Sequence, residues 1–149
     1  MPLYTFAMTF EVEIKSLLGN AERADALRAA MQRLDAGTKL VAKGRQLNHY
    51  FTGGNLQALF PKLYPYFSER QQEKLRKIGA SATEFSVRTR QRDDAVLFVV
   101  KASVDDTTSS NGIARMEFEE KVPLSLQELD QLLLDSGFLY QAKWSRERE

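Results

Sequence analysis

Apolar and charged residues alternate with a period of two in three separate parts of this chain. The alternation runs through Phe10–Lys15, Phe85–Arg90 and Arg115–Lys121. Successive side chains of a β-strand point to opposite faces, so each segment predicts a strand with one apolar face and one charged face. The chain must therefore fold in a way that uses a sheet with a charged face.

The other strand and helix signals predict an α+β fold dominated by antiparallel sheet. Strands are expected at Thr9–Ser16, Lys39–Thr52, Thr83–Arg92, Ala95–Ser103, Ile113–Val122 and Phe138–Arg148. Capping boxes at Ser68 with Gln71 and at Ser125 with Glu128 indicate the starts of two helices. Asn20 can cap a further helix, and a shorter helical turn is expected after Asn55. We expect a single domain over residues 1–149, with residues 53–82 forming a helical insertion.

The overall composition excludes several classes of protein. The net charge of the 149 residues is only +1, so the chain as a whole has no strong attraction to DNA or to membranes. The absence of cysteine excludes disulfides and thiolate chemistry, and a single histidine, His49, excludes a site with several histidine ligands. The longest apolar run, Ala95–Val100, is too short to cross a bilayer, and the start has no signal-peptide pattern. We expect a cytoplasmic protein.

The charged strand faces allow two interpretations. Each one alone is typical of the solvated outer face of a half-buried sheet. If the sheet closes into a barrel, however, the charged faces meet in its interior, where charge must be paired or used. That interior would contain seven cations, Lys15, Arg88, Arg90, Lys101, Arg115, Arg146 and Arg148, against four carboxylates, Glu11, Glu13, Glu117 and Glu119.

The surplus of cations suits a polyphosphate, because the planar arginine fork matches phosphate oxygens. Glutamates close to phosphates suit Mg²⁺ or Mn²⁺, which prefer oxygen ligands. This combination predicts phosphoryl or nucleotidyl transfer through positioning and charge neutralisation.

Several of these segments, in this order, resemble the CYTH superfamily of triphosphate tunnel metalloenzymes. Glu11-Val12-Glu13-Ile14-Lys15 is similar to the family's Glu-x-Glu-x-Lys signature, and Asn48-His49-Tyr50-Phe51 to its second-strand segment. The later basic and acidic strands are matched by Arg88-x-Arg90, Lys101, Arg115-x-Glu117-x-Glu119 and Lys143–Arg148. The resemblance covers the chain from about Thr9 to its last residue.

The resemblance implies an antiparallel tunnel barrel with helices packed outside and Mg²⁺- or Mn²⁺-dependent action on a triphosphate. It implies catalytic roles for Glu11, Glu13 and Lys15 and metal binding by Glu11, Glu13, Glu117 and Glu119. Substrate binding would fall to Lys15, Arg88, Arg90, Lys101, Arg115, Arg146 and Arg148. The substrate would be ATP, tripolyphosphate or thiamine triphosphate. The reaction stays open between a phosphohydrolase, a class IV-type adenylyl cyclase and a triphosphate-binding module without catalysis.

Two points depend on the end of the chain. The family usually continues with further strands after the Lys143–Arg148 segment, so we expect the barrel to lack its last strands unless a partner supplies them. An edge left unpaired in this way favours association, and a homodimer is one possible outcome. The sequence leaves open on which face of its strand Trp144 lies.

Overall fold

The computed structural model describes residues 16–105 and 113–149. The chain divides into two compact units, Met1–Leu40 and Val41–Glu149. The first contains helix α1, Ala21–Leu34, whose first turn is capped as predicted, because the Asn20 side chain accepts a hydrogen bond from the Arg23 amide at 2.9 Å. The second unit contains the sheet and the remaining helices.

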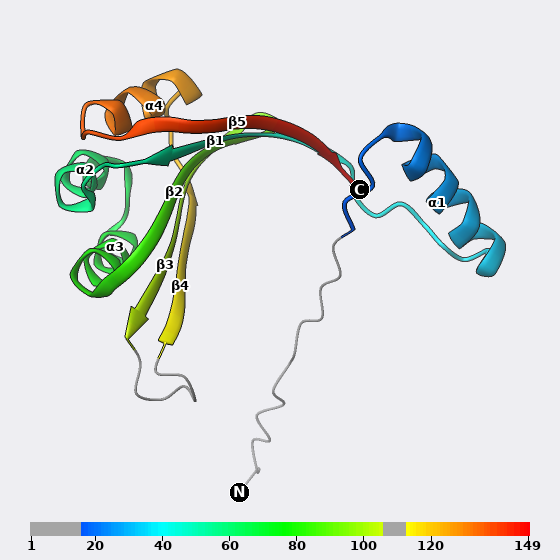
Figure 1. Cartoon of the computed structure of the whole chain (residues 1–149), viewed down its shortest axis with the longest axis horizontal. Coiled ribbons are helices and arrows are strands. Elements are labelled where there is room, and N and C mark those ends of the chain that lie inside the picture. Colours follow the sequence, from blue (N-terminus) through cyan, green and yellow to red (C-terminus); the bar gives the residue numbers. More distant parts are fainter. Residues whose placement is uncertain (1–15, 106–112) are drawn as a thin grey trace, which may run out of the picture. The chain divides into compact units, whose positions relative to one another are not determined.

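The sheet has five antiparallel strands in the order β4-β3-β2-β1-β5 (Figure 1). Their bounds are β1 Gly44–Thr52, β2 Ala82–Arg92, β3 Ala95–Asp105, β4 Ile113–Lys121 and β5 Leu139–Arg148. The prediction of an α+β fold with an antiparallel sheet is confirmed, and β2, β3 and β4 pair in sequence order as a meander. The sheet formed by the described strands is not closed, so the barrel stays a prediction. The strand expected at Thr9–Ser16 lies, apart from Ser16, outside the described residues.

The helices of this unit start where the sequence indicates. They are α2 Leu56–Leu63, the short 3-10 helix η1 Tyr64–Tyr66, α3 Glu69–Ser81 and α4 Leu126–Leu134. Both capping boxes are formed, with Ser68 and Gln71 at the start of α3 and Ser125 and Glu128 at the start of α4. Among the described residues, no helix is both long enough and apolar enough to span a membrane.

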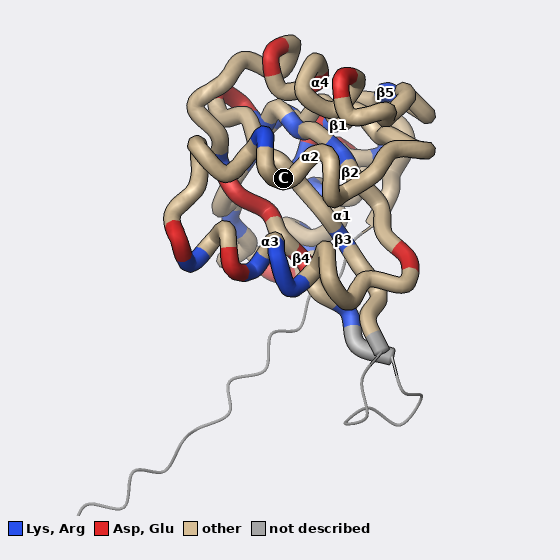
Figure 2. The backbone as a smooth tube through the Cα atoms, turned by 90° about the vertical axis from the view of Figure 1, so that its left-hand side faces the viewer, with Lys and Arg blue, Asp and Glu red and all other residues tan. Residues whose placement is uncertain are grey.

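The hydrophobic core lies between α2, α3 and α4 and one face of the sheet. Residues of all three helices belong to one buried core, and the helices gather at the left of the sheet in Figure 1; Figure 2 views the molecule from that side and marks the basic and acidic positions along the backbone. The helices and the strands contribute fully buried side chains to this core, among them Leu59, Leu63, Leu75, Ile78, Leu129, Leu133, Val87, Phe98 and Phe118. The apolar side of the strand alternation therefore faces the helices.

A close approach between Gly54 and Phe138 joins the entry of α2 to the start of β5. A Cβ atom at Gly54 would lie 2.1 Å from the Phe138 ring, which is itself 1% exposed. The position therefore requires glycine, because any side chain would displace a core aromatic ring.

Candidate functional site

The strand pairing brings most of the predicted site residues onto the face of the sheet opposite the helices. Directly paired residues of an antiparallel sheet point to the same side. Following the pairs across the sheet puts six predicted cations, Arg88, Arg90, Lys101, Arg115, Arg146 and Arg148, on one face with Glu117 and Glu119. We call this surface of β1 to β5 the charged face. The remaining predicted residues, Glu11, Glu13 and Lys15, lie outside the described residues.

Arg90 is held at the centre of the charged face. It is only 7% exposed, and its Nε donates to Asn48 Oδ1 at 2.7 Å while its Nη1 donates to Glu119 Oε1 at 2.8 Å. Arg92 also approaches Glu119, with Nη1 3.7 Å from the same oxygen. Two arginines therefore share one carboxylate, and the local charge stays positive.

The other predicted carboxylate is also paired with a cation. Glu117 Oε1 lies 3.3 Å from Lys101 Nζ, in a pair whose side chains are about half exposed. No cluster of three or more potential metal-ligating side chains occurs in residues 16–105 and 113–149. Glu117 and Glu119 do not make a metal site by themselves, and the predicted site depends on Glu11 and Glu13 to complete it.

Two amide side chains of β1 provide hydrogen-bond donors beneath the arginines. Gln46 and Asn48 are 2% and 0% exposed. Gln46 Oε1 accepts from Arg146 Nε and Nη2 at 3.2 and 3.1 Å, and Asn48 Oδ1 accepts from Arg90. Arginine only donates hydrogen bonds, so these contacts fix both amide oxygens and direct the NH₂ groups elsewhere.

Three buried donors on the charged face have no acceptor among the described residues. They are Gln46 Nε2, Asn48 Nδ2 and Arg88 Nε. A buried donor without an acceptor costs free energy, and buried polar groups in proteins are nearly always bonded. On the charged face, buried hydrogen-bond donors therefore outnumber the acceptor oxygens available to them.

The electrostatic environment of Arg146 agrees with this. Burial lowers the pKa of its guanidinium below the usual value, and the nearby positive charges of Arg148, Arg90 and Arg88 lower this pKa further, while Tyr50 raises it. The guanidinium of an arginine stays charged even so. Mutual repulsion among these arginines would be relieved by an anion bound between them.

Two aromatic residues also belong to the charged face. Tyr50 lies on β1 two residues from Asn48, and Trp144 on β5 is the Cα partner of Asn48. Trp144 therefore shares its face with Arg146, which settles the side that the sequence left open. Gln46, Arg92 and Trp144 were not among the predicted site residues. Arg92 has the parity of Arg90 and Trp144 that of Arg146, so the strand period indicates both, whereas Gln46 is placed on this face only by the pairing of β1 with its neighbours.

On the opposite face, a polar cluster fastens α4 to the centre of the sheet. Asp130 of α4, 4% exposed, accepts from Thr89 Oγ1 at 2.6 Å, from Tyr140 Oη at 2.7 Å and from His49 Nδ1 at 2.7 Å. Desolvation, the hydrogen bond to Asp130 and the charge of Asp130 raise the pKa of Tyr140 from 10.0 to about 12. We interpret this Asp130 cluster as structural, because its members satisfy one another beneath a helix.

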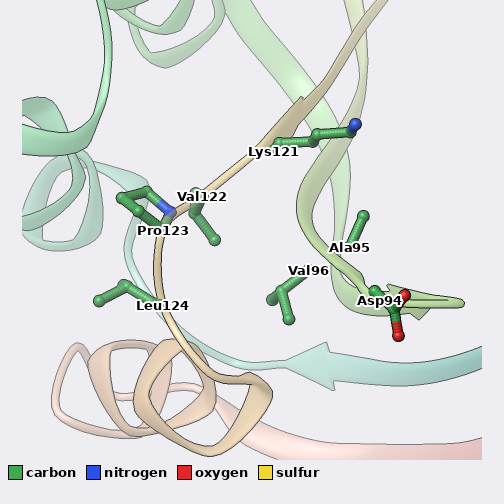
Figure 3. A pocket seen from close by; sticks show the side chains of 7 residues that line it. All are labelled: Asp94, Ala95, Val96, Lys121, Val122, Pro123 and Leu124. Atoms are coloured by element: carbon green, nitrogen blue, oxygen red, sulfur yellow. The ribbon is translucent and has the colours of Figure 1, made fainter.

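Two surface hollows border the strands. The larger has a volume of about 470 Å³ and lies where β3 begins and β4 ends, lined by Asp94, Ala95, Val96, Lys121, Val122, Pro123 and Leu124 (Figure 3). None of the predicted site residues in the described part of the chain lines it. The smaller, of about 340 Å³, reaches the charged face through Gln46, Arg92 and Arg148.

Comparison with protein-family models, with curated proteins and with solved structures found no match to this chain.

Proposed function

We propose that the charged face binds the phosphates of a triphosphate compound. The observation that carries the proposal is the excess of donors on this face, where Gln46, Asn48 and Arg88 each direct a buried N–H group to no acceptor in the described part of the chain. Phosphate oxygens accept hydrogen bonds, and their negative charge would balance the excess positive charge of the arginines.

The alternative is that these arginines belong to a solvated outer face. Solvated arginines are usually exposed, however, whereas Arg90 is 7% exposed and both amides beneath the arginines are almost fully buried. Burial of several positive charges close together is costly when no negative charge balances them, because like charges repel each other. Binding of a polyanion accounts for both the burial and the unused donors.

The reaction we propose is metal-dependent hydrolysis of the bound triphosphate, as the resemblance to triphosphate tunnel enzymes implies. Mg²⁺ or Mn²⁺ would be held by Glu11 and Glu13 together with Glu117 and Glu119. When bound, such an ion neutralises phosphate charge during transfer. To take part, Glu117 and Glu119 must exchange their present partners, Lys101 and Arg90, for the ion.

Thermal stability tests the binding step. Tripolyphosphate should raise the melting temperature, because a ligand at a hundredfold excess over its dissociation constant stabilises the native state by about 2.7 kcal/mol. Added salt should reduce the shift by screening. Arg88→Gln and Arg146→Gln should each lose much of it, while Arg76→Gln on α3, away from the charged face, should keep the wild-type shift. Equal shifts in all four proteins would refute the proposal.

Product analysis then separates the reactions. Incubation of the wild-type protein with Mn²⁺ and ATP, tripolyphosphate or thiamine triphosphate should release phosphate. Cyclic AMP from ATP would instead identify an adenylyl cyclase, and the absence of any product despite ligand-induced stabilisation would identify a binding module.

A further inference from the structure

We infer that Tyr50 and Trp144 form a stacking site for a flat aromatic ring, so that the bound triphosphate is an organic ester carrying such a ring and not inorganic tripolyphosphate. The inference rests on the proposed function, since it concerns the part of the same ligand that is not phosphate. It begins from the position of the two rings on the charged face.

Core packing does not explain these two aromatic residues. The hydrophobic core lies on the helix side of the sheet and, among the described residues, includes neither of them. Trp144 is 38% exposed, on a face otherwise dominated by arginine. The two rings stack on each other, with centroids 5.8 Å apart and planes 20° from parallel.

Each ring is also accompanied by a guanidinium group. Arg88 Cζ lies 4.7 Å from the centroid of the Tyr50 ring, and Arg146 Cζ lies 5.1 Å from the centroid of the Trp144 ring. Arg88 Nη1 also donates to Tyr50 Oη at 3.1 Å. Both kinds of group are flat, and proteins stack nucleobases on aromatic rings and on guanidinium planes.

A simpler explanation is that the rings serve only to order the two arginines. A guanidinium over an exposed aromatic ring contributes little free energy, however. A base stacked on an aromatic side chain strengthens binding by roughly ten- to a hundredfold. A ring that slides onto Trp144 can therefore displace Arg146 from it. The displaced guanidinium can then turn to the phosphates.

The spacing along the strands fits a single compact ligand. Arg146 follows Trp144 by two residues on the same face, a separation of roughly 7 Å along a strand. Across the sheet, Trp144 pairs with Asn48, which pairs with Arg90. A ring on Trp144 therefore places its attached phosphates beside Arg146, Arg90 and the unbonded amide of Asn48.

The chain contains one tryptophan, so its fluorescence reports on this site alone. Titrations of the wild-type protein should use ATP, thiamine triphosphate and tripolyphosphate, with binding followed both by calorimetry and by tryptophan emission. Tripolyphosphate carries more charge than ATP, so electrostatics alone would favour it. We expect instead that at least one of the two organic esters binds at least tenfold more tightly than tripolyphosphate and changes the tryptophan emission more.

Substitutions assign that preference to the rings. Trp144→Leu should remove the tenfold preference and leave the affinity for tripolyphosphate within about twofold of wild type, by the argument from stacking. Tyr50→Leu should weaken the preference. Tyr66→Leu is the matched control, since Tyr66 is a similarly exposed aromatic residue of η1, outside the sheet.

Two results would overturn the inference while leaving the proposed function intact. One is that tripolyphosphate binds as tightly as both organic esters in the wild-type protein. The other is that Trp144→Leu weakens all three ligands equally. Failure of every ligand to bind would reject the proposed function and the stacking site with it.

Discussion

Replacement of Asp130 should reveal how strongly the polar cluster under α4 holds the sheet. Asp130→Leu keeps a side chain of similar size but removes the acceptor of three hydrogen bonds. Asp130→Asn keeps one oxygen, which can still accept from His49 and Tyr140, while the new NH₂ group can donate to the Thr89 hydroxyl. The leucine variant should therefore lose far more stability than the asparagine variant.

The magnitude follows from the burial of the three donors. Tyr140 is 40% exposed and can turn its hydroxyl to water, whereas Thr89 and His49 are 0% and 9% exposed and cannot. Each buried donor left without an acceptor costs about 1–3 kcal/mol, so two such donors cost about 2–6 kcal/mol. That is a large part of the 5–15 kcal/mol by which domains of this kind are typically stable.

Urea unfolding followed by circular dichroism measures these free energies. The sharpest test adds Thr89→Val to each background. In the wild-type protein this change should destabilise, because Asp130 loses a donor. In Asp130→Leu it should stabilise, because it removes a buried hydroxyl without an acceptor. A similar loss in both backgrounds would refute the argument from unsatisfied donors.

Two further predictions concern the tyrosine of this cluster and the metal. The pKa of Tyr140 is about 12 in the folded protein, whereas its ordinary value, expected in the unfolded state, is 10.0. Between these pH values the unfolded state therefore binds fewer protons than the folded state, so the free energy of unfolding should fall as the pH rises through this range. Tyr140→Phe should make that fall shallower in unfolding experiments at a series of alkaline pH values, and an unchanged slope would exclude the effect. Glu11→Gln and Glu13→Gln should weaken the Mn²⁺ dependence of activity more than they lower the melting temperature. Unchanged metal titrations in both variants would remove these residues from the metal site.

Local signals in the sequence predicted most of the individual elements. The capping boxes at Ser68 and Ser125 mark the starts of α3 and α4, because the two partners of each box are only three residues apart. The alternation along β2 and β4 indicated which residues share a face. Parity within a strand is a local property, so it can be found without the tertiary structure.

The contacts that build the site depend on pairs far apart in the chain. His49 and Asp130 are separated by 81 residues, and Arg146 and Gln46 by 100. β5 pairs with β1 and not with β4, the strand that precedes it in the chain, and no pattern within β5 specifies that choice. Parity places Trp144 on the same strand face as Arg146, but only the pairing with β1 brings that face beside Asn48 and Arg90.

Neighbouring residues of β1 and β2 serve the two faces of the sheet in turn. Thr89 points to Asp130, while Arg88 and Arg90 on either side of it point to the charged face. In β1, His49 points to Asp130 and Asn48 to Arg90. The bonds to Asp130 therefore tie β1 and β2 to one helix through His49 and Thr89, which are directly paired in the same register that puts Asn48 opposite Arg90. Hydrogen bonds buried under α4 thus hold in place the donors that we propose for phosphate on the other side.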